Sequence, residues 1–488
     1  MLCVLRGKFR PNHLFTPPFL RTFALYSIDL KNSLPLALDG STIVAISTAP
    51  GAGGIAVVRI SGPDAFGFGS TVFSKSLDAK SDRRVVFGRI LSESGEIIDE
   101  GLALVLCGPR SYTGEDTIEF NIHGSTYIQT EVVRLLVLAG CRLAGPGEFT
   151  QRAFLNGRLD LTQAEAVADL IASEHSGAHR LAISQLRGGF SREIGALRES
   201  LIGFAGLLEL ELDFSEEDVE FADRNRFNEL LKDLLTRISS LAASFRAGNA
   251  IKSGVPIAIL GAPNAGKSTL LNALVGDDRA IVSDTPGTTR DIIEDTCVIG
   301  STLFRFIDTA GLRPTEDSIE SEGIRRAKDK AESAHSVLYL LDPSEYTASS
   351  GSSAIEELNL PEEVSVIAVW NKCDLGGNHP PVEGASHTIE ISASEGSGLN
   401  ELKDLLNSSH GLEASVSSLV VTNERHYEAL ILAEKSLLAV QSGLNGDVPS
   451  DLVAIDVRES LQHLGSITGA VHADDILGHI FSHFCIGK

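Results

Sequence analysis

The chain has 488 residues, of which 43% are hydrophobic and 22% charged, values typical of a globular protein with about three domains. Its formal net charge of −24 opposes indiscriminate binding to nucleic acid or to anionic lipid, although a local basic patch can still bind RNA. The six cysteines form no C-x-x-C pair, which argues for a reducing compartment, and no apolar stretch approaches the ~20 residues that span a bilayer.

The N-terminus has an unusual charge pattern. Residues 1–28 contain no Asp or Glu, whereas 65 acids in 488 residues predict about four (65/488 × 28). The same stretch holds four basic residues, Arg6, Lys8, Arg10 and Arg21. An acid-free, Arg-bearing N-terminus is typical of an organellar transit peptide, so we expect residues 1–40 to be one. This places the protein in a chloroplast or mitochondrion, the chloroplast being preferred, and a plain disordered tail is the alternative.

Residues 41–155 read as a small α/β domain. Apolar runs at 42–46, 55–60 and 101–106 predict strands, and turn-rich segments lie between them. Arg59 interrupts the second run. A guanidinium in such a run requires a carboxylate or an anionic ligand as its partner, unless the strand end is open to water.

The pattern is helical from Asp160 to about Gly248. Thr162-Gln-Ala-Glu165 fits a capping box, which predicts a helix beginning at Thr162. Residues 423–440 and 450–468 are helical again, but this tail is short for an independent domain. We therefore expect 156–253 and 411–488 to form one helical domain, into which 254–410 is inserted.

The inserted region begins with a phosphate-binding pattern. Val255 to Leu260 is an apolar run, and Gly261-Ala-Pro-Asn-Ala-Gly-Lys-Ser268 then matches G-x-x-x-x-G-K-[ST]. Backbone N–H groups of such a loop surround phosphate oxygens, Lys267 reaches the β- and γ-phosphates, and Ser268 binds Mg²⁺. A chance Gly-rich turn is the alternative.

Three more motifs follow in order, each after an apolar run: Asp308-Thr-Ala-Gly311, Asn371-Lys-Cys-Asp374 and Ser392-Ala-Ser394. In the first motif Asp308 can hold the metal, and in the second Asp374 can accept two hydrogen bonds from guanine. In the third, a backbone N–H can donate to the guanine carbonyl oxygen. Together with a candidate switch residue, Thr289, they indicate a GTPase rather than unrelated loops of an α/β domain. Ras-like proteins carry a water-orienting Gln where this chain has Leu312, so catalytic help must come from elsewhere.

The chain ends Phe484-Cys485-Ile-Gly-Lys488. Gly487 and Lys488 argue against a prenylation box. A buried or frayed terminus and a nucleophilic Cys485 both stay open, because no base is evident nearby in the sequence.

The chain from about Thr42 onward resembles the TrmE/MnmE family of tRNA-modification GTPases. The resemblance rests on Arg59-Ile-Ser-Gly62, Tyr112-Thr-Gly-Glu-Asp116, Pro146-Gly-Glu-Phe149, Arg152-Ala-Phe-Leu155, Leu159-Asp-Leu161, the phosphate loop, Gly287-Thr-Thr-Arg-Asp291, Asp308-Thr-Ala-Gly-Leu312 and Cys485-Ile-Gly-Lys488. It implies an α/β plus all-α architecture, in which a P-loop GTPase domain is inserted into a helical domain behind a small α/β folate-binding and dimerisation domain.

The resemblance also implies the chemistry. With an FAD-dependent partner of the GidA/MnmG type and a tetrahydrofolate one-carbon donor of the 5-formyl or 5,10-methylene type, the family modifies carbon 5 of the wobble uridine of certain tRNAs. A homodimer within a heterotetramer is the expected assembly, with no membrane. By motif, the residues expected at folate are Arg59, Glu119, Arg158 and Lys488. Glu320, expected to position the attacking water, and Cys485, whose role is open, are the catalytic candidates.

The expected nucleotide ligands are Asn264, Ala265, Gly266, Lys267, Ser268, Thr269, Ser283, Thr289, Asp308, Thr309, Ala310, Gly311, Asn371, Lys372, Asp374, Ser392 and Ala393. Mg²⁺ is expected at Ser268 and Thr289, and K⁺ at Asn264, Ser283, Thr285 and Thr288. In this family K⁺ sits where an arginine finger would, and its charge stabilises the developing phosphate charge. Pro286 stands in the loop that wraps the ion and restricts its backbone.

A second hypothesis keeps the GTPase without modification chemistry: a nucleotide-switched RNA-binding or ribosome assembly factor. The folate-type residues and the terminal Cys-Ile-Gly-Lys favour the first hypothesis, because an assembly factor needs no one-carbon donor.

Overall fold

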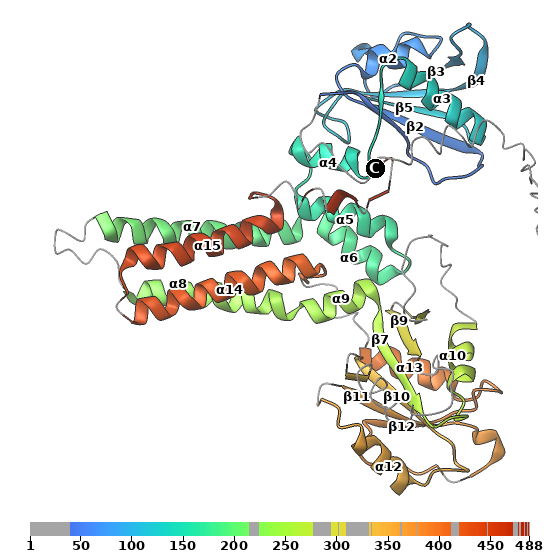
Figure 1. Cartoon of the computed structure of the whole chain (residues 1–488), viewed down its shortest axis with the longest axis vertical. Helices are drawn as coiled ribbons and strands as arrows, with labels where there is room; N and C mark the ends of the chain where they lie inside the picture. The colour runs from blue at the N-terminus through green and yellow to red at the C-terminus, as the bar shows by residue number, and fades with distance from the viewer. Residues whose placement is uncertain are drawn as a thin grey trace, which may run out of the picture. The chain divides into compact units, whose positions relative to one another are not determined.

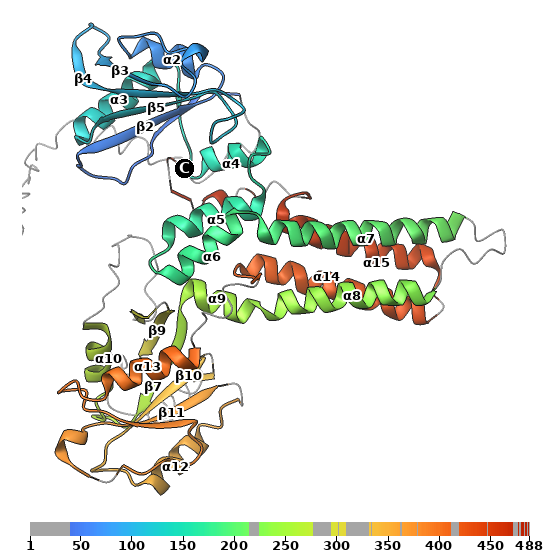
Figure 2. The ribbon, with the colours of Figure 1, turned by 180° about the vertical axis from the view of Figure 1, so that it is seen from behind.

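The computed structural model describes residues 40–213, 224–276, 294–300, 302–308, 331–332, 334–361, 364–377, 379–410, 419–446, 448–471, 477, 480–482, 484–485 and 487. The chain divides into two compact units, and Figures 1 and 2 show its ribbon from opposite sides. Unit 1 comprises residues 1–158 and 473–488, and unit 2 comprises residues 159–472.

Unit 1 is built on a six-stranded mixed sheet in the order β3-β4-β5-β2-β1-β6. Its strands are β1 (Ile43–Ile46), β2 (Ile55–Ser61), β3 (Val85–Leu91), β4 (Ile97–Leu106), β5 (Thr117–His123) and β6 (Arg142–Leu143). The β1–β6 pair is parallel and the other neighbours are antiparallel. The three strands expected from apolar runs are confirmed as β1, β2 and β4.

The two faces of this sheet carry different side chains. Ala56, Val58 and Ile60 alternate along β2 and pack with helices α2 (Ala65–Thr71) and α3 (Thr126–Leu138) in one buried core. Arg59 points to the opposite face, where Phe149 of α4 (Glu148–Leu155) packs on Ile43 and Ala45 of β1. Arg59 therefore lies on the sheet face opposite the main core. A 3-10 turn, η1 (Ala79–Ser81), is the remaining regular element of this domain among the described residues.

The C-terminal residues belong to unit 1 as well. The Gly147 N–H, just before α4, donates to the Cys485 carbonyl oxygen (3.3 Å), and the Ser47 hydroxyl donates to the Gly487 carbonyl oxygen (3.0 Å). Gly487 has φ +98°, and a Cβ on it would lie 2.2 Å from the Ile46 carbonyl oxygen. Only glycine fits this close approach to the end of β1.

Unit 2 contains a bundle of long helices. Helices α7 (Gly189–Asp213), α8 (Arg224–Ala243), α14 (Glu424–Asn445) and α15 (Ser450–Thr468) lie side by side in Figures 1 and 2 and share one apolar core. Three shorter helices complete it: α5 (Leu161–Ala172), α6 (Ser176–Leu186) and α9 (Phe245–Ser253). The helical expectation for residues 423–440 and 450–468 is confirmed.

The expected capping box at Thr162 is wrong. The N-cap is Asp160, whose carboxylate accepts from the Gln163 N–H, and the Gln163 side chain answers at the Asp160 N–H. Glu165 does not cap the helix; its carboxylate binds Arg425 and His426 of α14 instead. The local pattern fits either residue pair, and the long-range partners of Glu165 decide between them.

Unit 2 also contains a six-stranded sheet with the strand order β12-β11-β10-β7-β9-β8. Its strands are β7 (Val255–Gly261), β8 (Glu294–Ile299), β9 (Thr302–Asp308), β10 (Ser336–Leu341), β11 (Ser365–Trp370) and β12 (His387–Glu390). All neighbours are parallel except the β8–β9 pair. Helices α10 (Lys267–Gly276) and α13 (Leu399–His410) pack on one face and α12 (Ala348–Glu357) on the other. The chain thus combines an N-terminal α/β domain with a helical domain that carries an inserted P-loop GTPase-like fold.

The segments before and after this inserted sheet are tied together. The Ser244 hydroxyl accepts from the Val421 N–H (3.0 Å), and Ile251 of α9 packs with Val420 and with Leu181 of α6. The Gln185 amide donates to the Thr422 hydroxyl (2.8 Å). In the described parts of the chain, no helix is both long and apolar enough to cross a membrane.

Candidate functional sites

The phosphate loop lies where the sequence places it, between the central strand β7 and helix α10. Asn264 adopts a left-handed conformation with φ 66°. The Lys267 ammonium donates to the carbonyl oxygens of Gly261 (2.8 Å) and Ala262 (2.7 Å), which fixes the curvature of the loop. Ser268 and Thr269 begin α10 with exposed side chains, the position from which a hydroxyl can bind a metal at the phosphates.

Asn371 joins this loop to the rest of the site. It follows β11, is 2% exposed, and donates from Nδ2 to the Ala265 carbonyl oxygen (2.8 Å). Its Oδ1 accepts from the Ala393 N–H (3.0 Å). A Cβ on Gly266 would lie 2.2 Å from Asn371 Nδ2, so the loop reaches this amide only with glycine there. The phosphate loop and the two motifs expected to read the base are therefore joined through Asn371.

The residues expected to read the base lie at the same edge of the sheet. The Asp374 carboxylate accepts from the Ser392 hydroxyl, which also lies 3.2 Å from the Ser394 hydroxyl. Asp374 itself is exposed, so its second oxygen is open to a ligand edge. An exposed carboxylate held by one hydrogen bond is suited to accept from a purine with two adjacent N–H groups.

Lys372 is held by Asp342, which follows β10. Its Nζ lies 2.6 Å from Asp342 Oδ2. Burial alone would raise the pKa of Asp342, but the hydrogen bonds from Lys372 and Ser344 outweigh it and lower the pKa to about 2. Asp342 is therefore ionised at neutral pH and positions Lys372 beside the loop expected to read the base. No local sequence pattern had predicted this role for Asp342.

Several expected ligands lie outside the described residues: Ser283, Thr285, Thr288, Thr289, Thr309, Ala310, Gly311, Glu320 and Lys488. Asp308 is described as the last residue of β9, paired in register with Ile259 of β7. This puts its backbone at the carboxyl ends of the parallel strands, the edge at which open α/β sheets bind their ligands.

The N-terminal domain brings a second set of candidates together. Arg59 and Glu119 are register partners on β2 and β5, and both Nε and Nη2 of Arg59 lie 2.8 Å from Glu119 Oε1. The guanidinium carbon lies 5.3 Å from the Tyr112 ring centroid and 5.5 Å from that of Phe149. The expected partner of Arg59 is thus a carboxylate, and two aromatic rings flank the guanidinium at cation–π distance.

Arg158 and Cys485 approach this set from other segments. Arg158 is exposed, and its Cγ would lie 3.2 Å from a Cβ built on Gly114, inside the turn that carries Tyr112. Cys485 is exposed and is tied through its carbonyl oxygen to Gly147, two residues before Phe149. The three N-terminal candidates of the described chain and Cys485 therefore come from segments that contact one another.

Sequence reasoning missed an ion network in the same domain, formed by Arg142, Arg152, Glu115 and Glu148. The Arg152 guanidinium is buried and binds Glu115 (3.1 Å) and Glu148 (3.0 Å), and Arg142 binds Glu148 as well. Burial acts to raise the pKa of Glu148, but the Arg142 hydrogen bonds, the Gly145 N–H and both arginine charges outweigh it, so the pKa is lowered. Glu115 and Arg152 both lie in motifs of the family resemblance, but nothing in the sequence indicates that they form a pair.

Comparison with known proteins gives a consistent result. The N-terminal domain model of the GTP-binding protein TrmE matches residues 42–158, and the MnmE helical domain model matches residues 161–485. The chain is 50% identical over 461 residues to the tRNA modification GTPase MnmE of Parabacteroides distasonis, covering 92% of this chain and 100% of that one. The MnmE of Flavobacterium johnsoniae is 48% identical over 467 residues with the same coverage.

Among solved structures, a variant of Aquifex aeolicus Era bound to GDP·AlF4⁻ aligns with 26% identity and a TM-score of 0.26, over 38% of this chain and 66% of that one. The G domain of the T. maritima FeoB iron transporter aligns with 25% identity and a TM-score of 0.25, over 32% of this chain and 98% of that one.

Proposed function

This chain belongs to the TrmE/MnmE family of tRNA modification GTPases, and we infer from that membership that it hydrolyses GTP and takes part in tRNA modification. The structural observation that best supports a guanine nucleotide here is the buried Asn371, which bonds to the phosphate loop at Ala265 and to the loop of Ser392 to Ser394 at Ala393. One side chain thus sets the spacing between the phosphate end and the base end of a bound guanine nucleotide.

The chain's own residues suit each part of that nucleotide. Backbone N–H groups from Asn264 to Thr269 would surround the phosphates at the N-terminus of α10, with Lys267 as the adjacent cation. Asp374 would select guanine by accepting from its N–H groups. Ser268, exposed in the first turn of α10, would hold Mg²⁺ together with Thr289, and this ion would supply positive charge between the β- and γ-phosphates.

We extend the proposal to K⁺ activation. Leu312 cannot orient water, so the charge that develops on the phosphates needs another stabiliser. The exposed, left-handed Asn264 can offer its side-chain oxygen beside the phosphate loop, with Ser283, Thr285 and Thr288 as the other proposed K⁺ ligands. Glu320 would position the attacking water.

The N-terminal domain is proposed to bind a tetrahydrofolate derivative. The flat ring system of a pterin suits the Tyr112 and Phe149 rings, and Glu119 can accept from its amino-pyrimidinone edge while Arg59 donates. Arg158 and Lys488 would bind the acidic tail. Folate would supply a one-carbon unit for carbon 5 of the wobble uridine, with an FAD-dependent GidA/MnmG-type partner and a homodimer within a heterotetramer. Cys485, tied to the α4 start, would lie near this donor.

The organellar setting rests on the acid-free residues 1–28. The family match begins at residue 42, after that stretch, and the relatives named above are bacterial. Fusion of residues 1–40 to a fluorescent protein tests the setting: import into a chloroplast or mitochondrion is expected, and a diffuse cytosolic signal would contradict it.

The first experiment is GTP hydrolysis by residues 41–488 in K⁺ and in Na⁺ at equal ionic strength. Marked stimulation by K⁺ alone is expected. Equal slow rates would remove the K⁺ mechanism while leaving the GTPase assignment. The tRNA role is tested separately, by wobble-uridine analysis in cells depleted of the protein. Loss of the modified base is expected, whereas unchanged tRNA with defective ribosomes would favour the assembly-factor hypothesis.

A further inference from the structure

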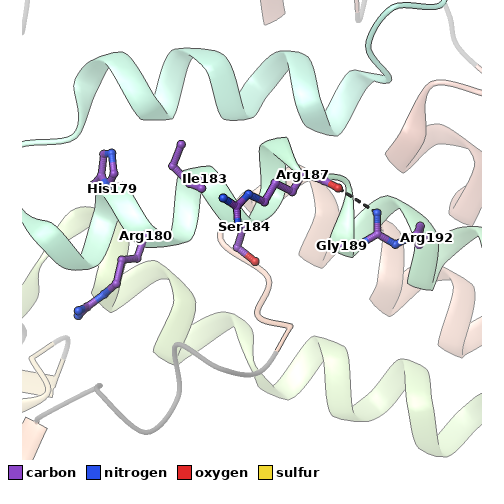
Figure 3. Close-up of a pocket in the computed structure, with 7 residues that line it drawn as sticks. All are labelled: His179, Arg180, Ile183, Ser184, Arg187, Gly189 and Arg192. Atoms are coloured by element: carbon purple, nitrogen blue, oxygen red, sulfur yellow. Dashed lines mark hydrogen bonds between the residues drawn. The ribbon is translucent and has the colours of Figure 1, made fainter.

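A cluster of basic residues lines a pocket where α6 meets α7, and neither the GTP site nor the N-terminal site uses it. The pocket has a volume of about 360 Å³. We call it the arginine pocket, and its lining residues are His179, Arg180, Ile183, Ser184, Arg187, Gly189 and Arg192 (Figure 3).

Helical spacing and one turn build this cluster. Arg180, Ser184 and Arg187 follow i, i+4, i+7 spacing along α6 and so share one face of that helix. At its end the chain turns through Gly188, with φ 73°, into α7. Arg192 then donates from Nη1 to the Arg187 carbonyl oxygen (2.9 Å), as the dashed line in Figure 3 shows, which holds a third guanidinium at the α7 end of the pocket.

The cluster stands out against the charge of the chain. Residues 175–192 contain no Asp or Glu, whereas the chain average predicts about two (65/488 × 18). Within the described chain, no carboxylate pairs with Arg180, Arg187 or Arg192. Three acids on the neighbouring segments have cationic partners of their own: Glu193 binds Arg237, Asp169 binds Lys252, and Glu165 binds Arg425. The three guanidinium groups of the pocket therefore have no direct carboxylate partner among the described residues.

The shape of the pocket limits the class of ligand. Five of its lining side chains, those of His179, Arg180, Ser184, Arg187 and Arg192, are exposed. A shallow cationic surface suits a chain of phosphates that passes over it better than a small cofactor, which is usually enclosed. The half-buried Ile183 adds one apolar contact, and the Ser184 hydroxyl adds a donor.

We propose that the arginine pocket binds the phosphodiester backbone of the tRNA. This rests on the proposed function, which makes tRNA the substrate. Guanidinium groups donate two parallel hydrogen bonds to phosphate, and each cation that neutralises a phosphate contributes to the salt dependence of binding. The local charge overcomes the overall charge of −24 because salt screens charges more than about 8 Å apart at physiological ionic strength.

The test compares tRNA binding by the full-length chain and its variants across a series of KCl concentrations. The variant Arg180→Gln/Arg187→Gln should bind tRNA about 10- to 30-fold more weakly near 0.15 M salt, and its log affinity should fall less steeply with log salt by about 1.5. The matched control Lys232→Gln/Lys435→Gln removes two exposed cations from α8 and α14 and should change both quantities little. Arg180→Lys/Arg187→Lys keeps the charge and should retain most of the affinity.

The outcomes separate this proposal from the proposed function. Equal tRNA affinity and equal salt slope in Arg180→Gln/Arg187→Gln and in the control Lys232→Gln/Lys435→Gln would overturn the proposal for the arginine pocket. This holds whether or not cells lacking the protein lose the modified uridine. An unchanged melting temperature and GDP affinity of the glutamine variant would show that a loss of tRNA binding is local. The proposal would be supported if Arg180→Gln/Arg187→Gln lost tRNA affinity, Lys232→Gln/Lys435→Gln did not, and Arg180→Lys/Arg187→Lys kept most of it.

Discussion

Asn371 and Ala265 are 106 residues apart in the sequence, yet the amide Nδ2 of Asn371 donates a 2.8 Å hydrogen bond to the Ala265 carbonyl oxygen. Asn371→Asp keeps the size of the side chain but replaces this donor with a second acceptor. The buried carbonyl would then lose its partner and face a carboxylate oxygen, which costs about 1–3 kcal/mol or more. GDP affinity is expected to fall about 10- to 100-fold, measured by titration calorimetry. Asn445→Asp, at an exposed helix end, is the control and should bind GDP normally.

We propose that Asp374 sets the base specificity of the site. Asp374→Asn exchanges an acceptor for a donor, so the preference should shift from guanine toward xanthine nucleotides. Competition between GDP and XDP for the variant measures the shift. Retention of the guanine preference would mean that Asp374 does not read the base.

The Arg59–Glu119 pair offers a test of the folate proposal with a control in the same sheet. Arg59→Gln should weaken tetrahydrofolate binding by about 10-fold or more, since it removes a charged donor between two rings. Arg89→Gln breaks an exposed cross-strand pair with Glu100 of the same residue types and should leave folate binding intact. Equal losses in the two variants would point to the sheet as a whole rather than to a site at Arg59.

Gly487 tests whether the C-terminus must contact β1. Gly487→Ala places a Cβ 2.2 Å from the Ile46 carbonyl oxygen at a φ of +98°, so the terminal segment would have to detach. The thermal midpoint of the N-terminal domain and its folate affinity should both fall, while GDP affinity stays unchanged. Gly195→Ala, in α7 with open space around it, is the matched substitution that should cost nothing.

Glu165 makes the helical domain sensitive to acid. Burial acts to raise its pKa, but the His426 and Arg425 charges and hydrogen bonds outweigh this and lower the pKa to about 2 from the ordinary 4.5. A lowered folded-state pKa contributes stability above pH 4.5 that is lost as the pH falls toward 2. The contribution is about 3 kcal/mol at neutral pH.

The measurement is the free energy of unfolding against pH for the wild type and Glu165→Gln. The wild type should lose stability between pH 5 and 2 more steeply than the variant, so that the difference between them shrinks in acid. Glu428→Gln, at an exposed position on α14, should parallel the wild type. Parallel curves for Glu165→Gln would contradict the role of this network.

The motifs of the inserted fold could be predicted because each follows an apolar run that becomes a parallel strand, and parallel strands bring their carboxyl ends to one edge. The same reasoning located β1, β2 and β4. It left out β3, β5 and β6. In the edge strand β3, Val85 and Phe87 are exposed, so the sequence lacks the apolar–polar alternation that marks a half-buried strand.

What sequence reasoning could not supply is pairing over long distances. Glu165 fits a local capping pattern, but its partners are 260 and 261 residues away. Arg152 and Glu115 lie in separate motifs, and the buried ion pair between them depends on how α4 packs against the strands. Asn371 belongs to a recognised motif, yet its contacts with Ala265 and Ala393 come from the fold and not from the pattern.

The bond between Ser244 and Val421 has a consequence for how the protein can be cut and rebuilt. Because the chain leaves the helical bundle and returns to it at one point, residues 254–418 could be replaced by a short linker without unthreading any helix. The inserted domain is, in this sense, an exchangeable module. A chain lacking it should still fold its bundle, and a related nucleotide domain with closely spaced ends could be installed in its place.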